Sequence, residues 1–434
     1  MGPGRGGRAR PAPVPGPPRG CGEGPDRIRV AQAAPAPRPP PTSVVVVSRG
    51  RPRALARCLA ALVAQDHPCL ELVLVADPPS AGLRPDLPIK RVAFDIPNIS
   101  AARNAGIAQA AGEVVLFVDD DAVPAASWAR RLALALAEPG VIAATGFTRG
   151  PDGLSWQCRA ERITPSGQAL PIAVAGPSLL GPEGGSAVST LGTNCGFRRE
   201  ALLAVGGFDP AFAFHLDESD LDMRLAARFP DGLTAVLPEA EVIHAMAPGT
   251  ARDAARLPHD LRAIGRSTAI FAVRHGGTTG WLEPAQRRRL LRLMVAGRMD
   301  PLAVGRVLAT LRAGLAEAPR APPPPPGPVA PDPAPPFLPL PTRPARVLFL
   351  AGWHWQARAL RRHAAAATAR GREVRLLLLS PGILPHRLVL TEGGWWEQRG
   401  GLWGPSQPGD PAVTFSRLSA RIRRERACLA LMRR

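Results

Sequence analysis

Three consecutive aspartates, Asp119, Asp120 and Asp121, are the residues of this sequence whose type and spacing most directly suggest chemistry. They follow the apolar run 114–118, which predicts a strand buried on both faces of a parallel sheet. Carboxylates this close repel one another, so we expect a compensating cation, and oxygen ligands favour Mg²⁺ or Mn²⁺ over zinc. The alternative is an acidic turn that caps a helix beginning at Pro124-Ala125-Ala126.

Strands and helices alternate around this run. The residue pattern predicts strands at 43–47, 71–75 and 91–94, and helices at 52–64 and 100–111. Such alternation predicts an α/β fold with a mostly parallel, right-handed sheet. Ligands of these sheets bind beyond the carboxyl ends of the strands, which is where the three aspartates fall.

The region after residue 125 is less regular. Helices are predicted at 125–138, 198–205 and 217–228, and short strands at 141–145, 234–237 and 241–244. Residues 150–192 are rich in Gly, Pro and Ser and have no clean period, so we expect a functional loop or lid there.

Composition limits the partners and the compartment. The 434 residues carry a net charge of +19, and all basic residues except Lys90 are arginines. This charge favours polyanions such as nucleotide diphosphates or anionic lipid headgroups, whereas nucleic acid is not expected because the basic segments lack interleaved aromatic residues. The six scattered cysteines form no C-x-x-C pair, which argues against zinc and a disulfide framework and favours the cytoplasm. No apolar run approaches the roughly 20 residues of a membrane-spanning helix.

Changes in composition predict five parts. They are a disordered Pro/Arg/Gly-rich tail (1–41), an α/β catalytic domain (42–250), a basic helical extension (251–318), a Pro-rich linker (319–345) and a small Rossmann-like α/β unit with a basic C-terminal helix (346–434). The basic helices at 287–293 and 417–434 either lie on an anionic membrane or pack their arginine faces on the protein.

Motifs between residues 43 and 247 resemble, in order, those of family-2 glycosyltransferases of the GT-A fold. The first two are S-R-G-R-P at 48–52 and N-I-S-A-A-R-N-A-G-I at 98–107. The aspartates of 119–121 resemble the family's D-x-D motif, and segments 192–199 and 205–209 resemble its acceptor side. The last motif, D-E-S-D-L at 217–221 with Arg224, resembles E-D-x-D-L-x-x-R.

The resemblance implies a site for a nucleotide-sugar donor and a divalent cation, Mn²⁺ or Mg²⁺. The implied metal ligands are Asp119, Asp121 and His244, although a lone histidine at a strand end is more often a packed one. The implied donor contacts are Asp77, Arg103, Asp120 and Arg49. Ala76 stands where the family usually has a first acid, which leaves a plain turn role open for Asp77.

Inverting transfer requires a carboxylate that accepts the proton of the acceptor hydroxyl. The resemblance places this base at Glu218 or Asp217, and the longer reach of glutamate favours Glu218. Alternatively, both acids only interact with the dipole of the helix that begins there. The implied acceptor-side residues are Asn194, Gly207 and Phe208.

These patterns predict a metal-dependent inverting glycosyltransferase that moves a sugar from a nucleotide-diphosphate sugar to a glycan or lipid-linked hydroxyl. A nucleotidyltransferase is an alternative, but residues 48–52 offer one glycine instead of a glycine-rich triphosphate loop. A non-catalytic polyanion-binding module is a third reading. We expect a cytoplasmic protein and leave open a peripheral contact with the inner face of the plasma membrane. The sequence does not identify the sugar, the acceptor or the linkage.

Overall fold

The computed structural model describes residues 1–2, 37–245, 257–319, 321–329, 335–342 and 347–431. Most of the predicted disordered tail lies outside these residues, and so does the predicted domain boundary at residue 250. Residues 38–434 group into one unit, and the description below concerns that unit.

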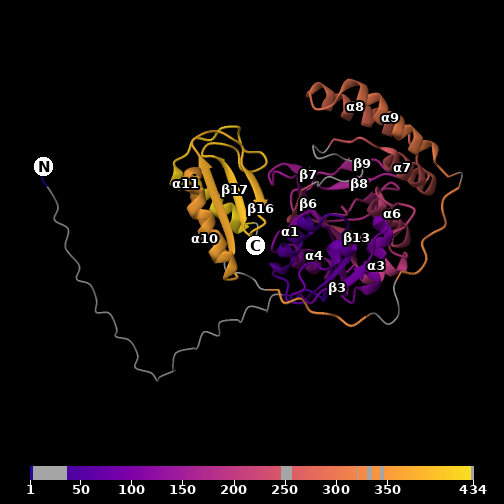
Figure 1. Ribbon diagram of the computed structural model, residues 1–434, viewed down its shortest axis with the longest axis horizontal. Helices are drawn as coiled ribbons and strands as arrows, with labels where there is room; N and C mark the ends of the chain where they lie inside the picture. Colours follow the sequence, from indigo (N-terminus) through magenta and orange to yellow (C-terminus); the bar gives the residue numbers. More distant parts are fainter. Residues whose placement is uncertain (3–36, 246–256, 320, 330–334, 343–346, 432–434) are drawn as a thin grey trace, which may run out of the picture. The chain divides into compact units, whose positions relative to one another are not determined.

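A mostly parallel sheet forms the centre of the catalytic domain (Figure 1). β1 (Thr42–Ser48) lies between β2 (Leu70–Ala76) and β4 (Val114–Asp119), and β3 (Lys90–Ala93) pairs with β2, all in parallel. Antiparallel β12 (Cys195–Arg198) joins β4 to β6 (Val141–Arg149), and β13 (Leu233–His244) and β10 (Ser178–Leu180) complete the order. The predicted α/β fold with a mostly parallel sheet is confirmed.

Both faces of this sheet are covered by helices, which explains its continuous apolar strands. Val44 and Val46 face the core shared with α1 (Pro52–Val63) and α4 (Trp128–Ala137). Val45 faces the opposite core, which contains α3 (Ile99–Gln109), α5 (Arg199–Ala204) and α6 (Asp217–Arg228). α3 approaches the sheet closely at Gly106, where an added Cβ would lie 2.4 Å from a methyl group of Val45.

Residues 150–192 are more ordered than predicted. β7 (Trp156–Cys158) pairs with β6, and β8 (Glu161–Ile163), β9 (Ala169–Pro171) and β11 (Ala187–Val188) form a separate three-stranded sheet. Strands of two or three residues are too short to produce a recognisable alternation, so the prediction of an irregular loop was wrong. The two strands predicted at 234–244 are one strand, β13, with an irregularity between Leu237 and Val242.

The helical extension consists of α7 (Arg262–His275), α8 (Leu282–Val295) and α9 (Pro301–Ala316), which share an apolar cluster. The Pro-rich segment follows, and its residues 335–342, here called the proline strap, pack against the catalytic domain. Leu340 is buried in the core and donates its N–H to the Leu70 carbonyl at 2.7 Å. The N–H of Leu338 donates to the buried carboxylate of Glu71 at 2.9 Å, and Lys90 pairs with that carboxylate at 2.9 Å. The strap is therefore not a free spacer.

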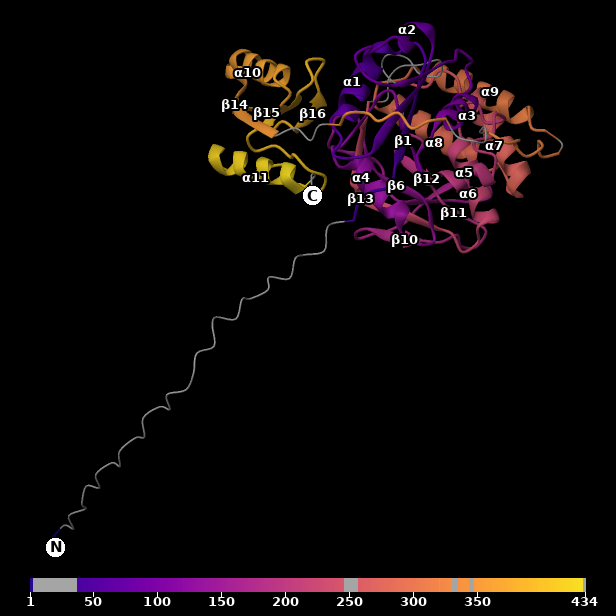
Figure 2. The same ribbon diagram turned by 90° about the horizontal axis from the view of Figure 1, so that it is seen from below.

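The C-terminal unit is a four-stranded sheet in the order β14 (Val347–Trp353), β15 (Glu373–Ser380), β17 (Trp396–Gly401), β16 (Arg387–Leu390). The first three strands are parallel and β16 is antiparallel. Figure 2 shows α10 (Ala357–Ala369) and α11 (Leu418–Leu431) on opposite faces of this sheet, in agreement with their separate apolar clusters. α11 packs on its own unit through Leu418 and Ile422.

None of the helices in the described part of the chain is both long and apolar enough to cross a lipid bilayer.

Candidate active site

The carboxyl ends of β1, β2 and β4 bring the predicted site residues to one edge of the central sheet. In the registers of these strands Val47 pairs with Asp119, and Ser48 pairs with Ala76, directly before Asp77. The chain then turns into β5 (Ala122–Pro124), which pairs with the end of β13. This pairing sets Ala122 opposite His244 and so brings the imidazole to the aspartates.

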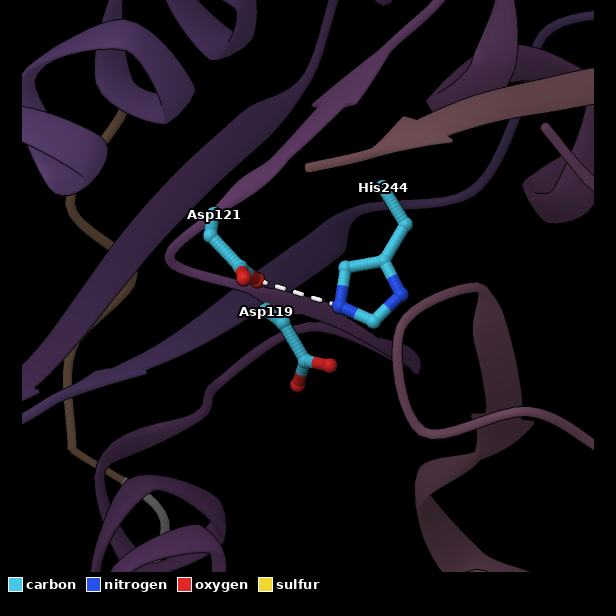
Figure 3. A group of neighbouring side chains, drawn as sticks. All are labelled: Asp119, Asp121 and His244. Atoms are coloured by element: carbon cyan, nitrogen blue, oxygen red, sulfur yellow. Dashed lines mark ion pairs between the residues drawn. The ribbon is translucent and has the colours of Figure 1, made fainter. Parts of the chain in front are cut away.

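Asp119, Asp121 and His244 form the metal group, a set of three possible ligands (Figure 3). One ligand atom of each lies within 4.8 Å of the others. Nε2 of His244 lies 3.2 Å from Oδ1 of Asp121, and its Nδ1 lies 3.1 Å from Oε1 of Gln157, which orients the ring. The two carboxylates are ligands that Mg²⁺ and Mn²⁺ prefer and the imidazole adds a nitrogen ligand, so the donor set is compatible with the predicted cation.

The helix-cap alternative for these aspartates does not describe the structure. Ala122–Pro124 form strand β5, and α4 begins only at Trp128. The aspartates are therefore separated from the first turn of that helix.

Asp120 is not part of the metal group. Its carboxylate is fully buried, accepts a hydrogen bond from Oγ of Ser48 at 2.7 Å and lies 3.4 Å from Nη1 of Arg51. Burial, opposed by Arg51 and Ser48, raises the pKa of Asp120 to about 7. The hydrogen bond with Ser48 ties β4 to β1, and the predicted donor contact of Asp120 stays a prediction.

Sequence reasoning missed Arg51. Its Nη1 also lies 3.4 Å from Oδ2 of Asp121, so one guanidinium contacts both Asp120 and Asp121. Its place just after β1, the strand that neighbours β4, was the available signal.

A second acidic cluster lies at the start of α6 and is joined to the first by Arg103. Nη1 of Arg103 donates to Oδ2 of Asp217 and lies 3.9 Å from Oε2 of Glu218, while its Nη2 lies 3.3 Å from Oδ1 of Asp119. The guanidinium is buried and contacts both acidic clusters, and its predicted contact with the donor stays a prediction. Leu216, just before the helix, has φ 62°, a strained value that fixes where α6 begins.

The three predicted acceptor-side residues lie behind this site. Asn194 is fully buried, and its side chain accepts a hydrogen bond from Nε1 of Trp128 at 2.8 Å. Phe208 is also buried, with its ring centroid 5.1 Å from the guanidinium of Arg103. Gly207 has φ +66°, which favours glycine. All three residues are buried, and their contact with an acceptor stays a prediction, because a motif resemblance gives the order of residues but not the direction of their side chains.

The predicted donor contacts Asp77 and Arg49 flank the end of β1. Oδ2 of Asp77 accepts the N–H of Gly50 at 3.0 Å, whereas its buried Oδ1 has no hydrogen-bond partner within the described residues. A buried acceptor of this kind is expected to take a partner from a ligand. Arg49 is half exposed and pairs with Asp95 at 2.7 Å.

Comparison with known proteins finds a family that is similar to part of this chain. Residues 43–206 match the model of the family described as glycosyl transferase family 2. A curated N-acetylglucosaminyltransferase of Bradyrhizobium diazoefficiens is 32% identical over 106 residues, which is 22% of this chain and 22% of that protein. The matched stretch thus spans about a fifth of that relative's length.

Two solved structures are similar to this chain. The mannosyltransferase PcManGT from Pyrobaculum calidifontis, in complex with GDP-Man and Mn²⁺, is 19% identical, with a TM-score of 0.37 over 65% of this chain and 76% of that one. TarS of S. aureus is 16% identical, with a TM-score of 0.38 over 64% of this chain and 53% of that one. Residues 43–206, the part of the chain that matches the model of glycosyl transferase family 2, contain β1 to β4 and the two aspartates of the metal group.

Proposed function

We propose that this chain is an inverting, metal-dependent transferase that moves a sugar from a nucleotide-diphosphate sugar to a hydroxyl of a glycan or lipid-linked acceptor. One observation carries the proposal. A single buried guanidinium, that of Arg103, contacts Asp119 of the metal group and Asp217 at the start of α6. The side that would bind the diphosphate and the side that would take the proton are therefore separated by one side chain.

Asp119, Asp121 and His244 would hold Mn²⁺ or Mg²⁺, and the bound cation would neutralise the charge of the leaving diphosphate. Arg51 lies beside Asp121 with a partly exposed guanidinium, which suits a second contact to phosphate oxygens. The unpaired Oδ1 of Asp77 suits a hydroxyl or N–H donor of the nucleoside.

Glu218 is the better base of the acidic pair. Its side chain is 22% exposed, whereas that of Asp217 is 4% exposed and is held by Arg103. Burial and the charge of Glu218 raise the pKa of Asp217. Burial would also raise the pKa of Glu218, but the hydrogen bond from Asp217 and the charge of Arg103 outweigh it and lower that pKa. Asp217 is held in the buried ion pair with Arg103, whereas Glu218, which is more exposed and has a lowered pKa, is the carboxylate that would accept the proton of the acceptor hydroxyl.

The acceptor requires contacts other than the buried residues of segments 192–208. Phe214 is exposed and lies four residues before Glu218 on the approach to α6. Aromatic rings of this kind give an acceptor sugar an apolar face to pack on. We therefore assign Phe214 to the acceptor side.

The test combines donor binding with turnover. Nucleotide-sugars are screened with Mn²⁺ for a rise in melting temperature, because a ligand of the folded state must stabilise it. Glu218→Gln should keep that rise and lose turnover by about 10²–10⁴-fold. Glu200→Gln, at an exposed glutamate in the first turn of α5, is the matched control and should behave like the parent protein.

Two outcomes would contradict the proposal. Full turnover by Glu218→Gln would remove the assigned base. Release of pyrophosphate from a nucleoside triphosphate, with no stabilisation by any nucleotide-sugar, would instead favour a nucleotidyltransferase.

A further inference from the structure

The carboxyl edge of the C-terminal sheet carries exposed apolar side chains that the proposed transfer reaction does not use. β14, β15 and β17 run parallel, so the turns that follow them meet at one edge of the sheet. Four side chains there, which we call the rim, are Trp355, Ile383, Leu384 and Phe415, exposed by 59%, 54%, 66% and 83%. Single exposed apolar residues are common on proteins, but a group of them marks an interaction surface.

The rim is one connected surface. The ring of Trp355 stacks on that of Trp353, with centroids 5.0 Å apart and planes at 14°. Trp353 shares an apolar cluster with Trp403, whose ring centroid lies 5.7 Å from that of Phe415. The N–H of Trp403 donates to the carbonyl of Gly382 at 3.0 Å, which fixes the loop that carries the two aliphatic members of the rim.

Positive charge borders this apolar surface. Arg358 follows Trp355 in the first turn of α10, and Arg417 follows Phe415 just before α11. Both arginines are exposed, and neither forms an ion pair with any residue that the structure describes. Aromatic and aliphatic side chains partition into the interface of a bilayer, and arginines are attracted to anionic headgroups.

We propose that the rim docks on the surface of an anionic lipid bilayer, with Leu384 and Phe415 entering the headgroup region and Arg358 and Arg417 meeting lipid phosphates. A sugar ligand is less favoured, because sugars pack on aromatic faces, whereas two of the four rim residues are aliphatic. One face of Trp355 is also covered by Trp353. The inference does not depend on the transferase reaction, because lipid binding is measured without donor or acceptor.

The test is co-sedimentation of the full chain with vesicles of phosphatidylcholine alone or mixed with phosphatidylglycerol. The chain should bind the anionic vesicles, and added salt should weaken binding because it screens the arginines. Leu384→Ser with Phe415→Ser should raise the lipid concentration for half-maximal binding by about tenfold or more. Phe415→Trp keeps an aromatic side chain at the rim and should bind the anionic vesicles as the parent protein does. Leu302→Ser is the matched control, since Leu302 is 75% exposed on α9, and should bind like the parent protein.

Equal thermal unfolding of all variants ensures that a loss of binding is not a loss of folding. The proposal is overturned if the parent chain binds neither vesicle, or if the rim variants bind as the parent does. Loss of binding in Leu302→Ser alone would move the contact to the helical extension and overturn it as well. A concentration-dependent dimer that the rim substitutions abolish, without vesicle binding, would assign the rim to a second copy of the chain.

Discussion

Removal of Arg103 is the perturbation that best tests how the two acidic clusters are held together. Arg103 and Asp217 are both buried, so Arg103→Met leaves the Asp217 carboxyl without its cation, and the loss of one partner of a buried pair costs about 3–5 kcal/mol. The already raised pKa of Asp217 limits this cost, because the carboxyl can take up a proton, so we expect the lower end, about 3 kcal/mol. For a unit of about 400 residues, whose unfolding entropy is about 0.8 kcal/mol/K, that value corresponds to a fall in melting temperature of about 4 °C.

The variants are compared with the parent protein by urea and thermal unfolding, and a second ion pair, less buried, serves as the control. Arg130 and Asp66 form a partly exposed ion pair at 3.0 Å, so Arg130→Met should cost about 1 kcal/mol or less. Asp217→Asn combined with Arg103→Met should recover part of the loss, because it removes the unpaired charge. Equal unfolding midpoints for Arg103→Met and Arg130→Met would refute the reasoning.

Two further predictions concern parts of the chain away from the metal group. Leu340→Ala in the proline strap should lower the free energy of unfolding by about 2–4 kcal/mol. Leu338 is more exposed in the same segment, so Leu338→Ala should lower it much less. Equal values for the two variants from urea unfolding would show that the strap does not contribute to stability. Burial, with the charge of Arg130, lowers the pKa of His67 from 6.5 to about 4, so its contribution to stability is present above pH 6.5 and is lost as the pH falls toward 4. Urea unfolding should therefore show a shallower acid loss for His67→Gln than for the parent protein, and an identical pH profile for the two would contradict this.

Much of the fold is readable from the sequence because the relevant signals are local. The apolar runs that form β1, β2 and β4 are long enough to predict buried strands, and the leucines of α1 repeat with helical spacing. The strands between residues 150 and 192 are too short for such a signal. The packing of the proline strap depends on Leu340 and on the distant Glu71, so no local pattern could show it.

The site was predicted only in part, because some of its signals are local and others depend on the fold. Asp119 and Asp121 could be found because several acids follow one strand, and His244 was found through the family resemblance. The direction of a side chain is a tertiary property, which is why Asn194 and Phe208 were expected to face an acceptor but are buried. The link that Arg103 makes between the two acidic clusters likewise exists only in the fold.

Binding of Mn²⁺ in the presence of a nucleoside diphosphate tests the proposed function most directly, and electron paramagnetic resonance measures it without any need to know the sugar. We predict one tightly bound Mn²⁺ whose spectrum shows a nitrogen coupling from His244. Asp121→Asn should bind Mn²⁺ with an affinity at least about tenfold lower, and His244→Gln should lose the nitrogen coupling. Unchanged Mn²⁺ binding in Asp121→Asn, in a protein that still unfolds like the parent, would contradict the assignment of this site.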